Sequence, residues 1–266
     1  MTDAGIDAAT TVQMTDEYGI TREGFVAAER PLTIYVDKRE VVTLMTMGSH
    51  PELLILGWLK NQRFITELSE IRSIQVDWQV SAAAVTTFKG IENLTARLAK
   101  RTVTTGCGQG TVFGGLMDDI ANINLPTANL KQSDIYTTLK ALTDYNDIYR
   151  RAGAVHGCAL SRGTDILKFV EDVGRHNAVD TIAGHMWLDA IDGSDTLFYT
   201  TGRLTSEMVI KVAQMGIPIL LSRSGTTQMG LELAQQLGVI LIARAKGRHF
   251  LIYNGLEHIL LDEIPR

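Results

Sequence analysis

The segment "LTSEMVIKVAQMGIPILLSRSGTTQMGLELAQQLGVILIARA" (residues 204–245) alternates two amphipathic stretches of helical length with two short apolar runs. Gly216 and Gly238 stand where helix C-caps belong, and Pro218 reinforces the first stop. Each apolar run has the length and the β-branched content of a buried strand. Strands and helices that alternate in this way predict a largely parallel β-sheet covered by helices.

The same alternation extends upstream to about residue 130. There we expect a helix, two strands, a second helix and a further strand, over residues 131–151, 154–160, 165–173, 176–190 and 195–201. We therefore place an α/β domain over residues 130–266. There are no internal repeats and no low-complexity tracts.

The N-terminal part has a different character. Residues 31–48 contain two β-rich runs around a polar turn, residues 50–63 have helical spacing with Pro51 in the first turn, and residues 71–88 alternate like a strand pair. These patterns predict a smaller α+β subdomain, which we place over residues 25–129. Residues 1–24 are predicted to form a flexible leader.

The composition excludes several classes of protein. The chain has 266 residues, of which 45% are hydrophobic and 21% charged, as in ordinary soluble globular proteins. Its net charge of −5 argues against a binder of nucleic acid or of an anionic membrane. No apolar run approaches the ~20 residues of a membrane span, and the acidic N-terminus has no secretion signal. Two cysteines make no disulfide framework, so we expect a cytoplasmic protein.

Arginines recur at four consecutive predicted strand ends: Arg175, Arg203, Arg223 and Arg244. In a parallel sheet these ends lie at one edge, next to the N-termini of the helices. Arginines grouped there would bind phosphates, and the expected ligand is a nucleotide or a cofactor that contains a pyrophosphate. The alternative is that each arginine only decorates a solvated loop.

The stretch "EDVGRHNAVD" (residues 171–180) brings together Arg175, His176 and three carboxylates. One interpretation is a polar, partly charged site in the crevice at the sheet edge. The other is a helix start, in which Asn177 and His176 help to cap the helix and Asp180 lies in its first turns. The spacing of the residues leaves both interpretations open.

Cys107 lies in the glycine-rich stretch "TTGCGQG" (residues 104–110), with small or polar neighbours and no apolar residues to anchor it. This setting indicates a reactive thiol rather than a core residue. A dinucleotide-binding fingerprint is excluded, because Thr111 stands where the third glycine belongs and a helix rather than a strand comes before the loop.

The second cysteine, Cys158, follows His156 in the apolar run "HGCAL". A zinc site would need further ligands at suitable spacing, and no C-x-x-C occurs, so we expect no metal site. Cys158 is expected in the core, and the role of His156 stays open.

At "FVEDVGRHNAVD" (residues 169–180) and over residues 204–238 the sequence resembles the formate dehydrogenase accessory sulfurtransferase family, FdhD. The resemblance runs from "ERPLTIYVD" (residues 29–37) to "ARAKGRHFLIYNG" (residues 243–255). It implies a layered sheet like that of cytidine deaminases, with helices on both faces, a smaller N-terminal α+β subdomain, and a homodimer.

The resemblance also implies an activity, namely sulfur transfer. A cysteine desulfurase would load a persulfide onto the loop cysteine that matches Cys107. The sulfur would then pass to the bis-molybdopterin guanine dinucleotide cofactor before the cofactor enters formate dehydrogenase. The family's cofactor-contacting segment matches Ile242, Ala243, Arg244, Ala245, Lys246 and Gly247. With Arg175, His176, Arg203 and Arg223, this segment would hold the cofactor phosphates, so we expect GDP or GTP to bind in vitro.

The chain departs from the family pattern at Gly110, where many members have a second cysteine in a C-G-x-C loop. This change excludes a disulfide within the loop but leaves a single-thiol persulfide carrier intact. A non-catalytic chaperone for the molybdenum cofactor is the alternative function. A zinc deaminase, suggested by fold analogy alone, is disfavoured because the H-x-E and P-C-x-x-C elements are missing.

Overall fold

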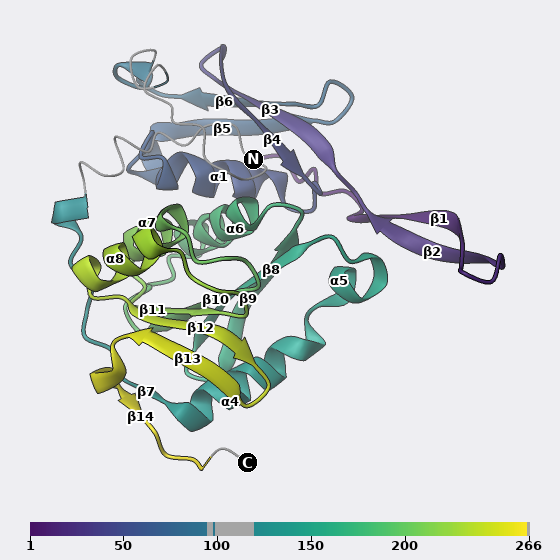
Figure 1. Ribbon diagram of the computed structural model, residues 1–266. Coiled ribbons are helices and arrows are strands. Elements are labelled where there is room, and N and C mark those ends of the chain that lie inside the picture. Colours follow the sequence, from purple (N-terminus) through teal and green to yellow (C-terminus); the bar gives the residue numbers. More distant parts are fainter. Residues whose placement is uncertain (95–97, 99–119, 265–266) are drawn as a thin grey trace.

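The computed structural model describes residues 1–94, 98 and 120–264 (Figure 1). Within these residues the largest sheet has six strands in the order β13-β12-β11-β10-β8-β9. β10, β11 and β12 pair in parallel, whereas β8 and β13 run antiparallel to their neighbours. The strands are β8 (His156–Arg162), β9 (Asp165–Asp172), β10 (Thr196–Thr200), β11 (Ile219–Ser222), β12 (Ile240–Lys246) and β13 (His249–Asn254).

The connections between strands explain why the sheet is parallel only in its centre. Tight turns join β8 to β9 and β12 to β13, and their glycines, Gly163 and Gly247, have φ of +56° and +60°. Such turns join antiparallel strands, whereas β10, β11 and β12 are connected through helices. With β8–β10, three of the five strand pairs of this sheet are antiparallel, so the expectation of a largely parallel sheet is wrong and only β10, β11 and β12 pair in parallel.

Helices cover both faces of this sheet. Alternate residues of a strand face two different hydrophobic cores, as do Leu220 and Leu221 in β11. This explains why the strands are apolar throughout. Three helices share the first core and one shares the second: α6 (Arg175–Leu188), α7 (Ser206–Gln214) and α8 (Gln228–Leu237), and on the other face α4 (Gln132–Ala141).

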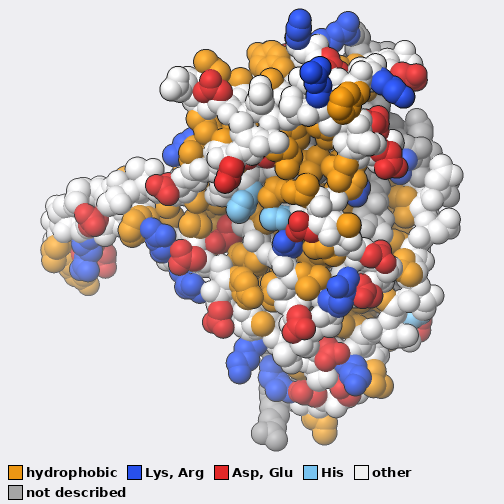
Figure 2. All heavy atoms as spheres, turned by 180° about the vertical axis from the view of Figure 1, so that it is seen from behind, with side chains coloured by type: hydrophobic (Ala, Val, Ile, Leu, Met, Phe, Trp, Pro, Cys, Tyr) orange, Lys and Arg blue, Asp and Glu red, His pale blue; other side chains and the backbone are white. Residues whose placement is uncertain are grey.

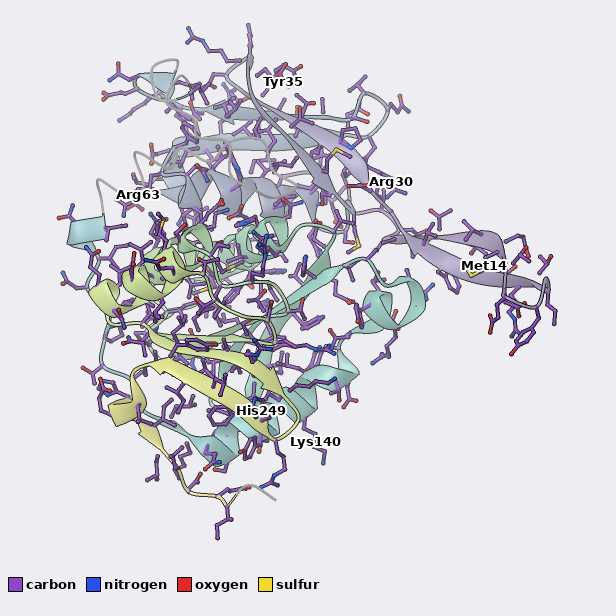
Figure 3. All side chains as sticks on the ribbon, in the orientation of Figure 1. Met14, Arg30, Tyr35, Arg63, Lys140 and His249 are labelled. Carbon is purple, nitrogen blue, oxygen red and sulfur yellow. The ribbon has the colours of Figure 1, made fainter. Side chains whose placement is uncertain are left out.

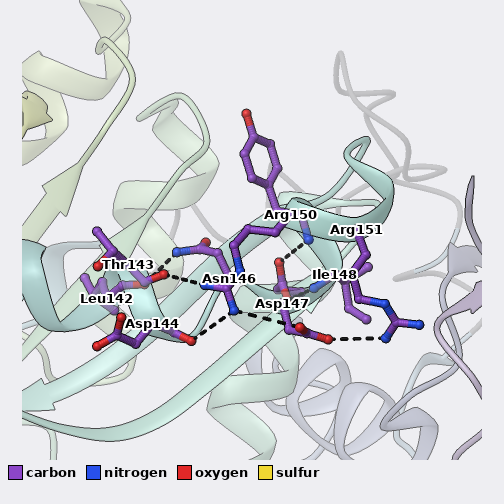
Figure 4. Close-up of polar contacts among 10 residues, drawn as sticks. Leu142, Thr143, Asp144, Asn146, Asp147, Ile148, Arg150 and Arg151 are labelled. Atoms are coloured by element: carbon purple, nitrogen blue, oxygen red, sulfur yellow. Dashed lines mark hydrogen bonds and ion pairs between the residues drawn. The ribbon is translucent and has the colours of Figure 1, made fainter. Parts of the chain in front are cut away.

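The helix expected over residues 131–151 is interrupted. α4 is followed by a 3-10 turn (Leu142–Asp144) and then by α5 (Asp147–Ala152). Asn146 lies between them with ψ of 60°, and its side-chain amide donates a 2.6 Å hydrogen bond to the Leu142 carbonyl (Figure 4). An asparagine that bonds to the nearby backbone in this way competes with continuation of the helix.

The N-terminal part forms a separate four-stranded sheet in the order β4-β3-β6-β5, with α1 packed beside it (Figure 1). Its core includes Leu32, Ile34 and Leu56. The predicted strand pairs and the predicted helix are confirmed. Their bounds are β3 (Arg30–Val36), β4 (Arg39–Thr46), α1 (Pro51–Asn61), β5 (Ile71–Asp77) and β6 (Ala82–Thr87); the short β7 (Leu130–Lys131) and β14 (Ile259–Leu260) pair with each other elsewhere.

Residues 1–24 differ from the flexible leader that we expected. β1 (Ala9–Thr15) and β2 (Thr21–Ala27) form an antiparallel hairpin that projects from the body of the molecule and carries Met14 (Figures 1, 2 and 3). The Asp16 carboxylate closes its turn by accepting backbone hydrogen bonds from Tyr18 and Ile20, both at 3.0 Å. The strands are mostly polar, which is why hydrophobic alternation did not reveal them.

α1 and α6 join the two parts of the molecule. The two helices cross at Gly57 and Gly184, where a Cβ atom would collide with the backbone of the other helix. Glycine is required there because the backbones approach too closely for a side chain. Within the described ranges, no helix is both long and apolar enough to cross a membrane.

Candidate anion site at the strand-end edge

The strand-end edge is the edge of the large sheet where β9, β10, β11 and β12 end. These four strands run in one direction, since β8 is antiparallel to both β9 and β10. Each of the four predicted arginines is placed there: Arg175 opens α6 after β9, Arg203 and Arg223 follow β10 and β11, and Arg244 lies near the end of β12. His249, labelled in Figure 3, begins β13 on the same side.

Backbone hydrogen bonds hold these loops side by side. The Arg223 amide donates to the Thr200 carbonyl at 3.1 Å, and the Arg244 amide donates to the Ser224 carbonyl at 2.8 Å. Arg244 has a φ of +53° in a bulge of β12, a left-handed conformation that is costly for a residue with a side chain. The predicted grouping of the arginines at one edge is therefore seen in the structure.

Three of these arginines, Arg203, Arg223 and Arg244, are exposed. In residues 1–94 and 120–264, their guanidinium groups have no hydrogen-bond acceptor and no ion-pair partner; the same holds for the ammonium group of Lys246. Positive charge that no described residue neutralises attracts anions to the edge.

The segment 242–247 divides between core and surface. The side chains of Ile242, Ala243 and Ala245 are at most 1% exposed and belong to the cores on the two faces of the sheet. Only Arg244, Lys246 and Gly247 are exposed. A ligand at this edge would therefore meet the charged side chains of the segment and the backbone of its end.

Arg175 and His156 are less exposed members of the same edge. Arg175 is 9% exposed, and the Nδ1 atom of His156 lies 3.3 Å from Thr201 Oγ1 at the end of β10. Burial and then the charges of Arg175 and Arg203 lower the pKa of His156, so its imidazole is neutral at pH 7. The sequence left the role of His156 open, and the structure places it at the strand-end edge.

His176, the other predicted site residue, faces a different environment. Its Nδ1 atom lies 3.4 Å from Glu207 Oε1, between α6 and α7. Burial lowers the pKa of His176 to about 3. The nearby Lys211 ammonium is buried and lies 2.8 Å from Asp180 Oδ2, and Asn61 donates a 2.7 Å hydrogen bond to Asp180. His176 thus belongs to a buried polar cluster rather than to the exposed arginines.

The carboxylates of residues 171–180 hold other segments in place. Glu171 accepts backbone hydrogen bonds from Ile148 and Tyr149, both at 2.9 Å, at the start of α5. Asp172 is buried and accepts four hydrogen bonds, and its pKa is raised because desolvation outweighs them. The donors are Thr46 Oγ1 (2.6 Å), Met47 N (3.2 Å), Gly174 N (3.0 Å) and Asn177 Nδ2 (2.8 Å). The helix does start here, with Gly174 as its N-cap, but no described side chain caps it, so the capping expected of His176 and Asn177 is not seen.

The two cysteines are in different situations. Cys158 is fully buried, so the expectation of a core residue is confirmed, and burial raises the pKa of its thiol to about 12. Cys107 lies outside the described residues. On the N-terminal side of it, Leu94 belongs to the N-terminal core and Leu98 packs against that core; on the C-terminal side, Ile120 belongs to the core that α6, α7 and α8 share.

Fold and site together define a mixed α/β protein with a cationic strand-end edge. Its structure is similar to the crystal structure of a protein from Desulfotalea psychrophila, described as a candidate formate dehydrogenase accessory protein. The TM-score is 0.75 at 28% sequence identity, over 97% of this chain and 100% of the other.

Sequence relatives agree with this likeness. The sulfur carrier protein FdhD of Listeria innocua is 30% identical over 241 residues, which are 89% of this chain and 92% of that protein. The protein of the same name from Bacillus pumilus is 29% identical over 235 residues, 88% and 90% of the two chains. The FdhD/NarQ family model matches residues 27–260, and the chain belongs to this family, as the resemblance predicted.

Proposed function

We propose that this protein is a sulfur carrier that serves the maturation of formate dehydrogenase. Membership of the FdhD/NarQ family and relatives named sulfur carrier proteins support the proposal. In the structure, the observation that carries it is the strand-end edge, where Arg203, Arg223 and Arg244 have no anionic partner among the described residues. Such an edge suits a substrate with several phosphates, as bis-molybdopterin guanine dinucleotide has.

The proposed sulfur transfer uses the Cys107 thiolate. It attacks the terminal sulfur of a persulfide on a cysteine desulfurase, the S–S bond of the donor breaks, and the donor cysteine leaves as a thiolate. Cys107 then holds the sulfur as a persulfide. Delivery to the molybdenum cofactor as sulfide consumes two electrons, supplied by a dithiol reductant, and returns Cys107 to the thiol. The missing second cysteine at Gly110 is compatible with this single-thiol cycle.

Three further features belong to the same proposal. Arg244, Lys246 and Gly247 of segment 242–247, together with Arg175, Arg203 and Arg223, contact the guanine dinucleotide phosphates, whereas Ile242, Ala243 and Ala245 only hold the segment in the core and His176 contributes from the neighbouring cluster around Glu207. The large sheet and its helices have the layering of the cytidine deaminases. The protein works as a cytoplasmic homodimer, because a cofactor with two guanine dinucleotide halves is well served by two symmetric copies of one site. Light scattering at tens of micromolar tests the dimer.

The carrier role is tested in cells that depend on this chain for formate dehydrogenase activity. Cys107→Ala should abolish that activity, and mass spectrometry of the wild type after incubation with a desulfurase and cysteine should show an added sulfur on Cys107. Cys158→Ala is the matched control, because the buried thiol has a pKa near 12 and should not carry sulfur.

The alternative is a cofactor chaperone that binds the molybdenum cofactor without carrying sulfur. It shares the strand-end edge and makes Cys107 dispensable. Full formate dehydrogenase activity with Cys107→Ala would exclude the carrier and favour the chaperone.

The phosphate site is tested by calorimetry with GDP. We expect binding in the micromolar-to-millimolar range that weakens with added salt, because the contacts are charge-assisted. Arg244→Ala with Lys246→Ala should weaken it by about a few kcal/mol in total. Lys38→Ala with Lys89→Ala removes the same charge from the N-terminal sheet, where both lysines are exposed next to β3 and β6, and should leave the affinity nearly unchanged. Absent binding, or equal affinities of the two double variants, would contradict the site.

A further inference from the structure

Among the four arginines of the strand-end edge, Arg175 stands apart. It is 9% exposed, whereas Arg203, Arg223 and Arg244 are exposed. An exposed arginine samples many rotamers and is screened by water and salt. A desolvated guanidinium in a fixed position interacts more strongly with a ligand and recognises its geometry. The contacts that fix the Arg175 side chain therefore influence which anions the strand-end edge can bind.

The loop after β10 provides the seat for the Arg175 side chain. A Cβ atom at Gly202 would lie 2.6 Å from Cδ and 2.9 Å from Cβ of Arg175. These distances are below any normal carbon–carbon contact, so the aliphatic stem of Arg175 lies directly on the Gly202 backbone. The loop cannot yield, because the Gly202 amide donates to Thr200 Oγ1 at 3.0 Å and its carbonyl accepts from Ser222 Oγ at 2.7 Å.

The helix that carries Arg175 is fixed as well. Asp172 accepts hydrogen bonds from the Gly174 amide at 3.0 Å and from the Asn177 side chain at 2.8 Å, on either side of Arg175 in the sequence. Asn177 also donates to the Met45 carbonyl at 2.6 Å. Hydrogen bonds hold both the start of α6 and the loop after β10, and the atoms that an added Cβ at residue 202 would meet belong to the Arg175 side chain, so we expect any side chain there to displace the stem of Arg175.

The position of the Arg175 charge links it to the edge. Together with Arg203, it acts on His156, whose imidazole lies 3.3 Å from Thr201, the neighbour of Gly202. Because the stem of Arg175 lies on Gly202, which directly precedes Arg203 in the chain, both arginines stand at the loop after β10. Two adjacent phosphate groups of one ligand can bind the guanidinium groups of both Arg175 and Arg203, whereas a single phosphate can be bound by the exposed Arg203 alone.

We propose that Gly202 is a specificity-determining position that seats Arg175, so that the strand-end edge selects a pyrophosphate group over a single phosphate. This inference rests on the proposed phosphate site and adds to it a residue that never contacts the ligand. Gly202 acts through Arg175 and is a positioning residue.

The test compares Gly202→Ala with Gly225→Ala, its counterpart in the loop after β11, where an added Cβ meets no atom within 4 Å. The probes are inorganic pyrophosphate, inorganic phosphate and GDP, measured by calorimetry on the full chain. Gly202→Ala should weaken the binding of pyrophosphate and GDP by about ten- to a hundredfold, which is what the loss of one charge-assisted hydrogen bond costs. The binding of inorganic phosphate should weaken much less. Gly225→Ala should stay within about twofold of the wild type.

A double-mutant cycle separates seating of Arg175 from a general disturbance of the loop. Arg175→Met keeps the stem and removes the charge, so it should lose pyrophosphate affinity, and adding Gly202→Ala to it should have no further effect. Arg175→Met also decides the question if Gly202→Ala does not fold, because unchanged pyrophosphate affinity in that variant would overturn the inference.

The outcomes distinguish this inference from the proposed phosphate site. A wild type that binds neither pyrophosphate nor GDP would overturn both. If the wild type binds both ligands, two results would overturn the role of Gly202 alone. One is that Gly202→Ala and Gly225→Ala bind pyrophosphate with equal affinity. The other is that Gly202→Ala weakens binding by the same factor whether or not Arg175→Met is present.

Discussion

Lys211 is 1% exposed, and its ammonium lies 2.8 Å from Asp180 and 3.5 Å from Glu207. Removing one partner of a buried ion pair leaves a charge without compensation. Lys211→Ala should therefore lower the free energy of unfolding by about 3–5 kcal/mol in urea denaturation. The exposed Lys140 in the last turn of α4 is the control, and Lys140→Ala should change the free energy of unfolding by about 0.5 kcal/mol or less. A loss below about 1 kcal/mol for Lys211→Ala would contradict a paired buried cluster.

His176, in the same cluster, predicts a dependence of stability on pH. Burial lowers its pKa from 6.5 to about 3, so between these values the unfolded chain binds a proton that the folded chain does not. Stability therefore falls as the pH drops below about 6.5, by up to about 2 kcal/mol from this residue at pH 5. Between pH 7 and pH 5, the free energy of unfolding of His176→Gln should therefore fall by less than that of the wild type, and the difference should be about 2 kcal/mol. Equal losses in urea titrations of the two proteins would show that His176 is protonated when folded.

At the scale of elements, the crossing of α1 and α6 depends on two glycines. Alanine is normally the better helix former by about 1 kcal/mol, so a destabilising Gly→Ala change within a helix reveals a steric conflict. A Cβ at Gly184 would collide with the Leu53 carbonyl oxygen, and we expect Gly184→Ala to lower the melting temperature. With about 2 kcal/mol of overpacking, the shift is about 4–8 °C for a chain of this size. Gly225→Ala should leave the melting temperature nearly unchanged, and a Gly184→Ala protein that melts above the wild type would refute the close approach.

At the scale of the whole molecule, the two parts should unfold together. Two of the three tryptophans, Trp58 and Trp78, lie in the N-terminal part, and Trp187 of α6 packs against its core, so their fluorescence reports mainly on that part, whereas far-UV circular dichroism reports on both. Because α1 packs on α6 and Asp172 bonds to Thr46 and Met47, we expect the two signals to give one urea midpoint.

A substitution in the other core sharpens this prediction. Phe198 is fully buried under α6, α7 and α8, and Phe198→Leu should cost on the order of 1 kcal/mol. In a cooperative molecule, the tryptophan signal should shift to lower urea by the same amount as the circular dichroism signal. A tryptophan midpoint that does not move would show that the two parts unfold independently.

The sequence by itself determined the features that rest on local periodicity. Apolar runs separated by amphipathic stretches and glycine caps located the strands and helices around residues 204–245. Such strands are buried on both faces of the sheet, so their residues are mostly apolar and the run is easy to recognise. The four arginines were also found this way, since the ends of parallel strands must share an edge. Family membership was readable from residues 169–180 and confirmed by the match over residues 27–260.

Only the tertiary structure decided which polar residues face the ligand edge and which face the core. His176 and Arg175 are neighbours in sequence, yet one lies beside Glu207 and the other on Gly202. The carboxylates of residues 171–180 have the composition of a charged site, but their partners, Ile148, Thr46 and Asn61, lie far away in the sequence. The hairpin of residues 9–27 was missed for a local reason, because its strands are mostly polar and show no hydrophobic alternation. For the polar residues of the edge and of the core, contacts between segments distant in the sequence decide where each side chain lies, and no local pattern of residues encodes such contacts.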